Sequence, residues 1–471
     1  MSPNTGSAAV LLGALLMTYG EIAPGAEDSA GRVHQPSPAP AAVAPLVLSE
    51  ALTLKQAGGR NPTVAVDRRA GTVYLAWAQE VPEAPPAPPE KNGERADPKL
   101  QVLLARSDDG GRRFETPVVM NSPKDRVQSH TVSPTQVAVG PRGEVYVLYS
   151  HHDFEFKQPG WKGGRSVLRL ARSDDGGRRF AAPIEIGGES VEGVVGSPSM
   201  INLFVAPDGA LYASWLDYRE SYLYVLALKK EPPEGQWPPT QLRVARSTEG
   251  GRRFASSTLV TKPVCGCCGT KVAQGTEGPL YASTRAEWPE LKSSVDAVRD
   301  IIVATSRDHG ASWSQAVKVH DDRFKISGCP DVAPGLSVDS RGRLHAAWYT
   351  GSERKAGVFY AVSTNGGKSF SAPLALLSDE WVPYADVKLA LDASDNAWVA
   401  FEDRRGETDL IHLVRVAPDG ALTRAKPWPG TIPDVAALGD SVVVAWGGLA
   451  PEEEQQGGGI QALIASPGTG P

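Results

Sequence analysis

Short apolar runs along the chain alternate with turns rich in Gly, Pro and Asp, and one combination of runs and turns returns many times. An apolar strand is followed by a turn of this kind and then by a strand rich in aromatic and β-branched residues, as in 64–66 leading to 73–77. The second strands of the copies end at Trp77, Tyr149, Trp215, Ser283, Trp348, Phe401 and Trp446. This pattern predicts seven antiparallel hairpins.

A second pattern is an eight-residue phrase that lies between these hairpins. Its form is Ser-x-Asp-x-Gly-x-x-aromatic, with Glu249 and Asn365 replacing the Asp in two copies. Ser and Asp side chains hydrogen-bond to nearby backbone amides, Gly accepts left-handed backbone angles, and the aromatic residue anchors the returning strand. The phrase therefore predicts the tip of an outer hairpin. The five copies begin at Ser107, Ser173, Ser247, Ser306 and Ser363.

Each inner hairpin paired with the outer hairpin that follows it gives a four-stranded antiparallel sheet. Repetition of such sheets with a period of roughly 60 residues predicts a single all-β propeller and not several domains. The count favours seven blades, and six would be correct if one inner hairpin were an insertion. The seventh unit has a third strand at 460–465 but no fourth. We expect the run 46–54 to supply it and to close the last blade.

The eight-residue phrase resembles the Asp-box of the sialidase superfamily, also called the bacterial neuraminidase repeat. Members of this superfamily are β-propellers, of which some hydrolyse terminal sialic acid and others only bind glycans or proteins. The resemblance covers nearly all of the chain after about residue 45, and it implies a fold more strongly than it implies a reaction. Familiar sialidases have six blades, so the count of seven departs from them.

Charge and the N-terminus restrict the partners and the location. The formal net charge is -6, with both signs interspersed. Nucleic acid is therefore not expected as a partner, because proteins that bind it usually present a basic face. The apolar run 8–17 is as long as a signal-peptide core and too short to span a bilayer. We expect a signal peptide at 1–26, a Pro/Ala-rich linker at 27–45 and the propeller at 46–471, with no membrane span and a periplasmic or secreted location. A disordered N-terminal tail is the alternative.

Strand parity within a blade predicts two different faces. All the Asp-box turns lie on one face, whereas the loops between second and third strands and the links between blades lie on the other. Long loops gathered on one rim of a rigid scaffold are the usual place for binding or catalysis, although each can also be a tolerated surface insertion. The long loops are 79–98, 150–164, 217–240 and 284–298.

All four cysteines fall in two links between blades: Cys265, Cys267 and Cys268 in one, and Cys329 in the next. Because neighbouring blades place their innermost strands side by side, the four sulfur atoms are expected to meet on the loop-bearing face. Disulfide pairing is one interpretation for an exported protein, and a bridge from the cluster to Cys329 is the easiest to build. A thiolate site for Zn²⁺ or Cu(I) is the other.

The resemblance also implies what a sialidase would need: three arginines that clamp the substrate carboxylate, a Tyr nucleophile polarised by a Glu, and an Asp acid/base. Arg60 stands where the family has its first arginine, and Arg219 and Arg404 follow second strands. Tyr384 is a candidate nucleophile by position, but no convincing Tyr-Glu pair accompanies it. We therefore predict that the loop-bearing face binds a glycan or protein ligand. An exo-sialidase and a purely structural scaffold are the alternatives, which leaves enzyme activity open.

Overall fold

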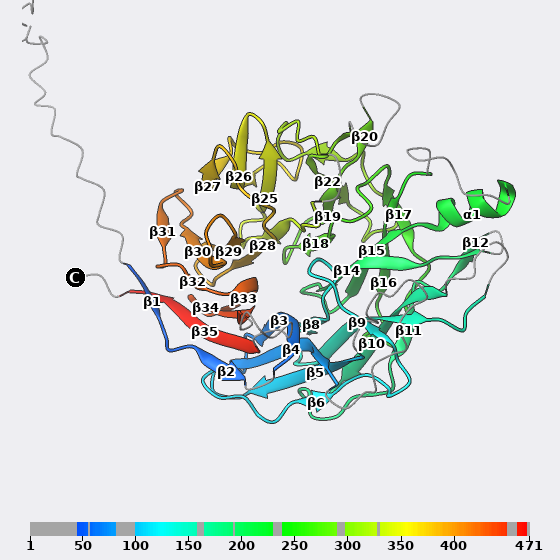
Figure 1. The fold of residues 1–471 in the computed structure, drawn as a ribbon, viewed down its shortest axis with the longest axis horizontal. Coiled ribbons are helices and arrows are strands. Elements are labelled where there is room, and N and C mark those ends of the chain that lie inside the picture. The colour runs from blue at the N-terminus through cyan, green and yellow to red at the C-terminus, as the bar shows by residue number, and fades with distance from the viewer. Residues whose placement is uncertain are drawn as a thin grey trace, which may run out of the picture. The chain divides into compact units, whose positions relative to one another are not determined.

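The computed structural model describes residues 45–54, 57–81, 99–157, 164–191, 194–228, 238–289, 297–326, 330–449 and 459–468. Its antiparallel sheets form a seven-bladed β-propeller, so the predicted all-β fold and the favoured blade count are confirmed (Figure 1). The expected signal peptide and all but the last residue of the expected linker lie outside the described residues. Within the described part of the chain, no helix is long and apolar enough to cross a membrane.

Blades 1 to 6 each consist of four strands that follow one another outward from the axis, with short additional pairings in some blades. Blades 1 to 3 contain β3 (Gly59–Asp67), β4 (Thr72–Glu80), β5 (Leu100–Ser107) and β6 (Val118–Val119); β8 (Gln136–Val139), β9 (Val145–Asp153), β10 (Arg165–Ser173) and β11 (Ile184–Ile186); and β14 (Pro198–Val205), β15 (Leu211–Asp217), β16 (Gln241–Ser247) and β17 (Thr258–Thr261). Blades 4 to 6 contain β18 (Lys271–Gln274), β19 (Leu280–Arg285), β22 (Ile301–Ser306) and β23 (Val317–Lys318); β24 (Gly335–Val338), β25 (Leu344–Ser352), β26 (Lys355–Ser363) and β27 (Leu374–Asp379); and β28 (Val387–Leu391), β29 (Ala397–Asp403), β30 (Leu410–Val416) and β31 (Leu422–Arg424).

Blade 7 joins the two ends of the propeller. Its strands β33 (Thr431–Leu438), β34 (Ser441–Gly447) and β35 (Ile460–Pro467) come from the C-terminal part of the chain. Both β1 (Leu46–Leu48) and β2 (Leu52–Leu54) pair antiparallel with β35, with Leu46 opposite Pro467 and Leu52 opposite Ala462. The blue N-terminal strands lie beside the red β35 in Figure 1. The predicted closure is confirmed, with two short strands in place of one.

The smaller elements lie outside the four-stranded pattern. Strand β7 (Val127–Gln128) pairs with β9, and β32 (Trp428–Pro429) pairs with β30. Two isolated pairs are β12 (Ser190–Val191) with β13 (Val194–Val195), and β20 (Trp288–Pro289) with β21 (Ala297–Val298). Helix α1 (Arg219–Leu228) follows the second strand of blade 3. These elements all belong to the connections between strands and blades.

Hydrogen bonds between side chains and backbone hold neighbouring innermost strands together around the axis. The Val64 amide donates to Asp434 Oδ2 at 2.9 Å and so joins blade 1 to blade 7. The Val272 amide donates to Asn202 Oδ1 at 3.0 Å, and the Ala333 amide donates to Asp386 Oδ1 at 2.9 Å. Every neighbouring pair of blades has at least one such bond or a backbone bond. The ring is therefore closed by polar contacts as well as by packing.

The five Asp-box turns form the local bonds that their sequence predicts. In each copy the Ser hydroxyl accepts a hydrogen bond from the amide of the Gly at the fifth position, at 2.8 to 3.0 Å. In the first copy, Asp109 Oδ1 also accepts from the Arg113 amide at 2.9 Å. This Gly has a positive φ in every copy, as at Gly177 with φ 80°, which explains why glycine stands there. The turn is self-supporting.

Candidate functional site

The candidate site lies on the loop-bearing face of blades 4 to 6. Two links between blades supply it: residues 262–270, which connect β17 to β18, and residues 380–386, which connect β27 to β28. Both links end at an innermost strand, so their last residues lie near the axis. The first link carries three of the four cysteines, and the second displays two aromatic side chains.

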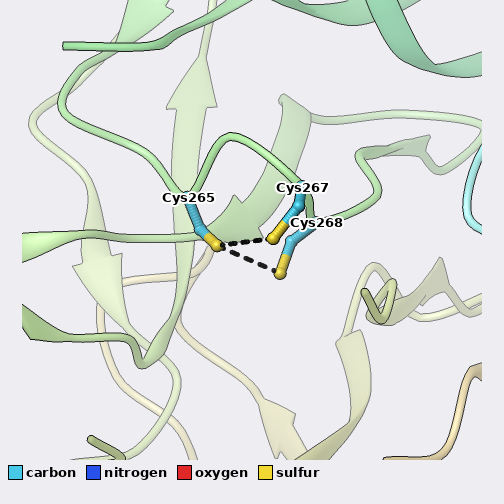
Figure 2. Close-up of side chains that lie close together, drawn as sticks. All are labelled: Cys265, Cys267 and Cys268. Carbon is cyan, nitrogen blue, oxygen red and sulfur yellow. Dashed lines mark hydrogen bonds between the residues drawn. The ribbon is translucent and has the colours of Figure 1, made fainter. Parts of the chain in front are cut away.

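Three cysteine sulfur atoms lie together in the first link (Figure 2). The Sγ atom of Cys265 is 3.5 Å from that of Cys267 and 3.4 Å from that of Cys268. Cys265 and Cys268 are buried free thiols, whereas Cys267 is not among the free cysteines. Cys329 lies outside the described residues, so its meeting with the cluster stays a prediction. The three atoms are close enough to bind one metal ion.

Contacts from neighbouring blades hold the cysteine loop in place. The Cys265 amide donates to the carbonyl oxygen of Arg285 at 2.9 Å, and the Gly269 amide donates to that of Val332 at 3.3 Å. The Tyr218 hydroxyl donates to the carbonyl oxygen of Gly266. Tyr218 comes from blade 3, Arg285 from blade 4, and Val332 from the entry to blade 5. The loop is therefore positioned by the ring and not only by its own turns.

The surroundings of the two free thiols differ in their effect on acidity. A hydrogen bond from Cys268, assisted by the Cys267 amide and the charges of Arg299 and Arg285, lowers the pKa of Cys265 to about 7. Burial raises the pKa of Cys268. A thiol with a lowered pKa is the better nucleophile and metal ligand at neutral pH. The cluster can therefore take part in soft-metal binding or in disulfide chemistry.

The second link displays Trp381 and Tyr384, whose side chains are 67% and 45% exposed. The residues between and beside them are anchored. Val382 is buried and its carbonyl oxygen accepts a hydrogen bond from Tyr349 at 2.8 Å. Ala385 is also buried. The link is thus anchored at Val382 and Ala385, while the rings of Trp381 and Tyr384 are exposed to solvent.

One buried arginine connects the cysteine loop to the aromatic link. Arg285 is fully buried and donates from Nη1 to the carbonyl oxygen of Arg299 at 2.5 Å and from Nη2 to that of Tyr349 at 2.7 Å. The ring of Tyr349 packs edge to face against Tyr384, with centroids 6.1 Å apart. The backbone carbonyl oxygen of Arg285 also accepts a hydrogen bond from the Cys265 amide, so the two links share one support.

Each arginine predicted from the sialidase resemblance has an acidic partner in the chain. Arg60 pairs with Glu80, and Arg404 pairs with Glu402. Arg219 is buried and pairs with Asp217 at 2.7 Å. These arginines belong to blades 1, 6 and 3. Among the described residues, no carboxylate hydrogen-bonds to the Tyr384 hydroxyl, and this residue lies with Tyr349 instead.

A polar cavity of about 170 Å³ occupies the axis of the ring. Lys271, Lys388 and Asp434 line it, and Lys388 forms an ion pair with Asp386 beside it. Burial, together with the charge of Lys388, lowers the pKa of Lys271 to about 8. Two lysines and two acids balance each other here, so the cavity gives no strong preference for an anion or a cation.

Three inner-strand residues that lie where the ladder register shifts have left-handed backbone angles: Asn61, Met200 and Ile432, each with φ of 51°. Such angles are unfavourable for a β-branched residue such as Ile432. The Glu402 carboxylate accepts the Ile432 amide at 3.0 Å. Glu402 therefore supports this strained strand as well as pairing with Arg404.

Comparison with solved structures places the chain among propellers. A protein of unknown function from Dyadobacter fermentans matches with a TM-score of 0.50 and 13% identity, over 89% of this chain and 99% of that one. An ulvan lyase of a polysaccharide lyase family matches with a TM-score of 0.52 and 11% identity, over 87% and 94%. A Hadza microbial sialidase matches with a TM-score of 0.47 and 15% identity, over 74% and 63%. The fold is thus similar to that of the polysaccharide lyase. Neither the protein-family models nor the curated proteins contain a match.

Proposed function

We propose that this chain binds a glycan on its loop-bearing face, with Trp381 and Tyr384 forming the platform for a sugar ring. The observation that carries the proposal is the exposure of both rings on a link in which the residue after each ring is buried. A pyranose ring has an apolar C–H face, which an aromatic ring can cover, and hydroxyl groups at its edge that need polar partners. Exposed aromatic residues on a rigid support suit such a ligand, because little side-chain freedom is lost on binding.

Charged groups at the start of the aromatic link supply the polar partners. Arg405 donates from Nη1 to Asp379 at 2.6 Å and from Nη2 to Asp403 at 2.8 Å. Asp379 lies two residues before Trp381 and remains half exposed. Sugar hydroxyls can donate to such carboxylates and accept from such guanidinium groups. An ulvan lyase of similar fold has been observed bound to a saccharide of glucuronic acid and sulfated rhamnose, which agrees with glycan binding by this kind of scaffold.

The test is retention of the fluorescently labelled chain on immobilised neutral, sialylated and uronic-acid glycans. We expect retention on at least one class, weakened roughly tenfold or more by Trp381→Ala or Tyr384→Ala, because aromatic anchors dominate small interfaces. Phe154→Ala is the matched control, since Phe154 is 66% exposed on a loop of the same face in blade 2. Retention that Trp381→Ala and Phe154→Ala weaken equally, or no retention on any glycan, would contradict the proposal.

The exo-sialidase alternative differs in its use of the arginines. A carboxylate clamp needs guanidinium groups that the substrate can engage, whereas Arg60, Arg219 and Arg404 are each paired with an acid. These pairs favour binding without hydrolysis. Turnover of a fluorogenic sialoside that Arg404→Ala abolishes would establish the alternative instead.

For the cysteines, we propose a disulfide between Cys267 and Cys329 beside a reduced pair, Cys265 and Cys268. The support is that Cys265 and Cys268 are free and that Cys329 is the remaining cysteine of the chain. Such a bridge fits the periplasmic or secreted location that we propose for the chain.

Alkylation of the denatured protein followed by mass spectrometry tests this pairing. Two thiols should be labelled without a reductant, and all four after reduction, in protein that contains less than stoichiometric metal. Four labelled thiols without reduction, together with one equivalent of zinc or copper in the purified protein, would favour the metal site instead.

A further inference from the structure

A second pocket, of about 530 Å³, lies on the opposite face, where the Asp-box turns are. It opens between blades 5 and 6, next to the residues that follow the fifth Asp-box and the turn 417–420 of blade 6. Its apolar lining includes Val362, Phe370, Leu374 and Val416. Nothing in the glycan proposal involves this face.

The pocket exists because a repeated contact is missing at this position. Elsewhere the Asp-box of one blade packs on a residue near the start of the second strand of the blade before it. A Cβ added at Gly177 would lie 2.9 Å from Tyr74, and one added at Gly367 would lie 3.1 Å from Tyr281. Blade 6 has the turn 417–420 in place of a box, and the equivalent residue of blade 5 is His345. The groove between these blades is therefore left unfilled.

The groove between blades 6 and 7 also lacks an Asp-box but is filled by a large side chain. Blade 7 also lacks an Asp-box, but the equivalent residue of blade 6 is Trp398, which is fully buried in the core between the two blades. A large side chain has taken the space there. The smaller imidazole of His345 leaves the space open.

The polar floor of the pocket is a hydrogen-bonded series of three side chains. His345 Nε2 lies 3.1 Å from Asp339 Oδ2, and His345 Nδ1 lies 2.5 Å from the Tyr360 hydroxyl. Burial lowers the pKa of His345, so the imidazole is neutral at neutral pH. Burial alone would raise the pKa of Asp339, but bonds from the Arg343 amide, His345 and the Arg343 side chain lower it. Nε2 therefore carries the proton that Asp339 accepts, and Nδ1 accepts from Tyr360.

Arg343 supplies a cation with an unused donor at the pocket wall. Its Nε donates to Asp339 at 2.5 Å, whereas its buried Nη2 has no hydrogen-bond partner among the described residues. A buried donor without an acceptor is unfavourable, and an anionic oxygen is the acceptor that relieves this most strongly. The series of Asp339, His345 and Tyr360 is already satisfied and offers no competing donor.

We propose that this pocket binds a small aromatic carboxylate, with its ring against Phe370, Leu374 and Val416 and its carboxylate on the Arg343 guanidinium group. The size of the pocket matches small-molecule sites, which are mostly apolar with a few fixed polar groups. The ring takes the place that an Asp-box would occupy in the other grooves. The site is separate from the glycan surface and does not depend on it.

Benzoate is the probe, and isothermal titration calorimetry with the full chain is the measurement. We expect saturable binding of benzoate that Arg343→Gln weakens roughly tenfold or more, because the charge-assisted bond is lost. The neutral analogue benzyl alcohol should bind the wild type more weakly than benzoate does. Arg341→Gln, which alters a neighbouring exposed arginine outside the pocket lining, should leave benzoate binding unchanged.

A second variant keeps the test decisive if Arg343→Gln is unstable. Thr364 is exposed at the pocket wall, so Thr364→Trp should fill the pocket and abolish benzoate binding without lowering the melting temperature. Glycan retention on the other face should persist in this variant, which separates the two proposals. Absence of saturable benzoate binding, or binding that both Arg343→Gln and Thr364→Trp leave unchanged, would overturn the inference.

Discussion

A chain that lacks residues 1–54 is expected to lose most of its stability, whereas a chain that lacks only residues 1–44 is expected to keep it. The longer deletion removes β1 and β2, which are both partners of β35. Leu46 and Leu48 pack on the core between blades 6 and 7, and Leu54 packs on the core between blades 7 and 1. These leucines and the lost strand hydrogen bonds together contribute on the order of 5 kcal/mol, which is a large share of the stability of an ordinary domain.

Urea unfolding followed by circular dichroism measures the difference between the two deletions. The deletion of 1–54 should unfold at a much lower urea concentration or purify as an aggregate, because β35 becomes an open sheet edge. A synthetic peptide of residues 45–54, added in trans, should restore part of the lost stability. Equal unfolding midpoints for the two deletions would show that the N-terminal strands do not close the ring.

Replacement of Arg219 by Met is expected to destabilise the fold by about 3–5 kcal/mol at pH 7, since it leaves a buried carboxylate without its cation. The Asp217 side chain is fully buried and accepts bonds from both Nε and Nη2 of Arg219, at 2.8 and 2.7 Å. This large effect is expected of a structural ion pair. A substrate clamp at the surface would instead change activity with little change in stability.

The stability that the Asp217–Arg219 pair contributes is expected to be lost at acidic pH. Burial by itself would raise the pKa of Asp217, but the bonds and charge of Arg219 hold this pKa below its usual value. The pair therefore stabilises the fold fully above the pKa of an unfolded Asp, about 3.9, and this contribution is lost as the pH falls through the lower pKa of the folded state. The difference in unfolding free energy between wild type and Arg219→Met should shrink in that acidic range.

The double variant Asp217→Asn/Arg219→Met is the control, because it removes the uncompensated charge together with its partner. It should recover much of the stability that Arg219→Met loses. Arg404→Met should cost less, since the Arg404 side chain is partly exposed. If Arg219→Met had the same free energy of unfolding as the wild type, Arg219 would not be a structural residue.

The fold was predictable because its information is local and repeated. The Ser, Asp and Gly residues of each Asp-box specify a turn through bonds within eight residues, as at Ser173 and Gly177. Five copies and seven inner hairpins then determine the blade count. The sequence pattern does not predict helix α1, because it indicates an irregular loop over 217–240. The structure describes a helix over Arg219–Leu228, beginning two residues after the buried Asp217.

The candidate site was predictable only in part. The cysteines of the first link were visible as residue types, and three of them do lie together. The support from Arg285 and Tyr349 was not visible in the sequence, because these residues are 64 positions apart and their hydrogen bond exists only in the folded ring. Trp381 was also missed, since sequence does not separate an exposed Trp from core residues such as Trp348 and Trp446. The sequence indicates Tyr384 as a candidate nucleophile by position, and we propose that it contacts a glycan instead.

Hydroxyl-radical footprinting of the chain with and without a glycan that it retains tests whether Trp381 and Tyr384 form the binding surface. We expect bound glycan to protect Trp381 and Tyr384 from modification while Phe154 reacts as before, since all three are exposed without ligand. Protection of Phe154 with unchanged reaction of Trp381 and Tyr384 would contradict this expectation.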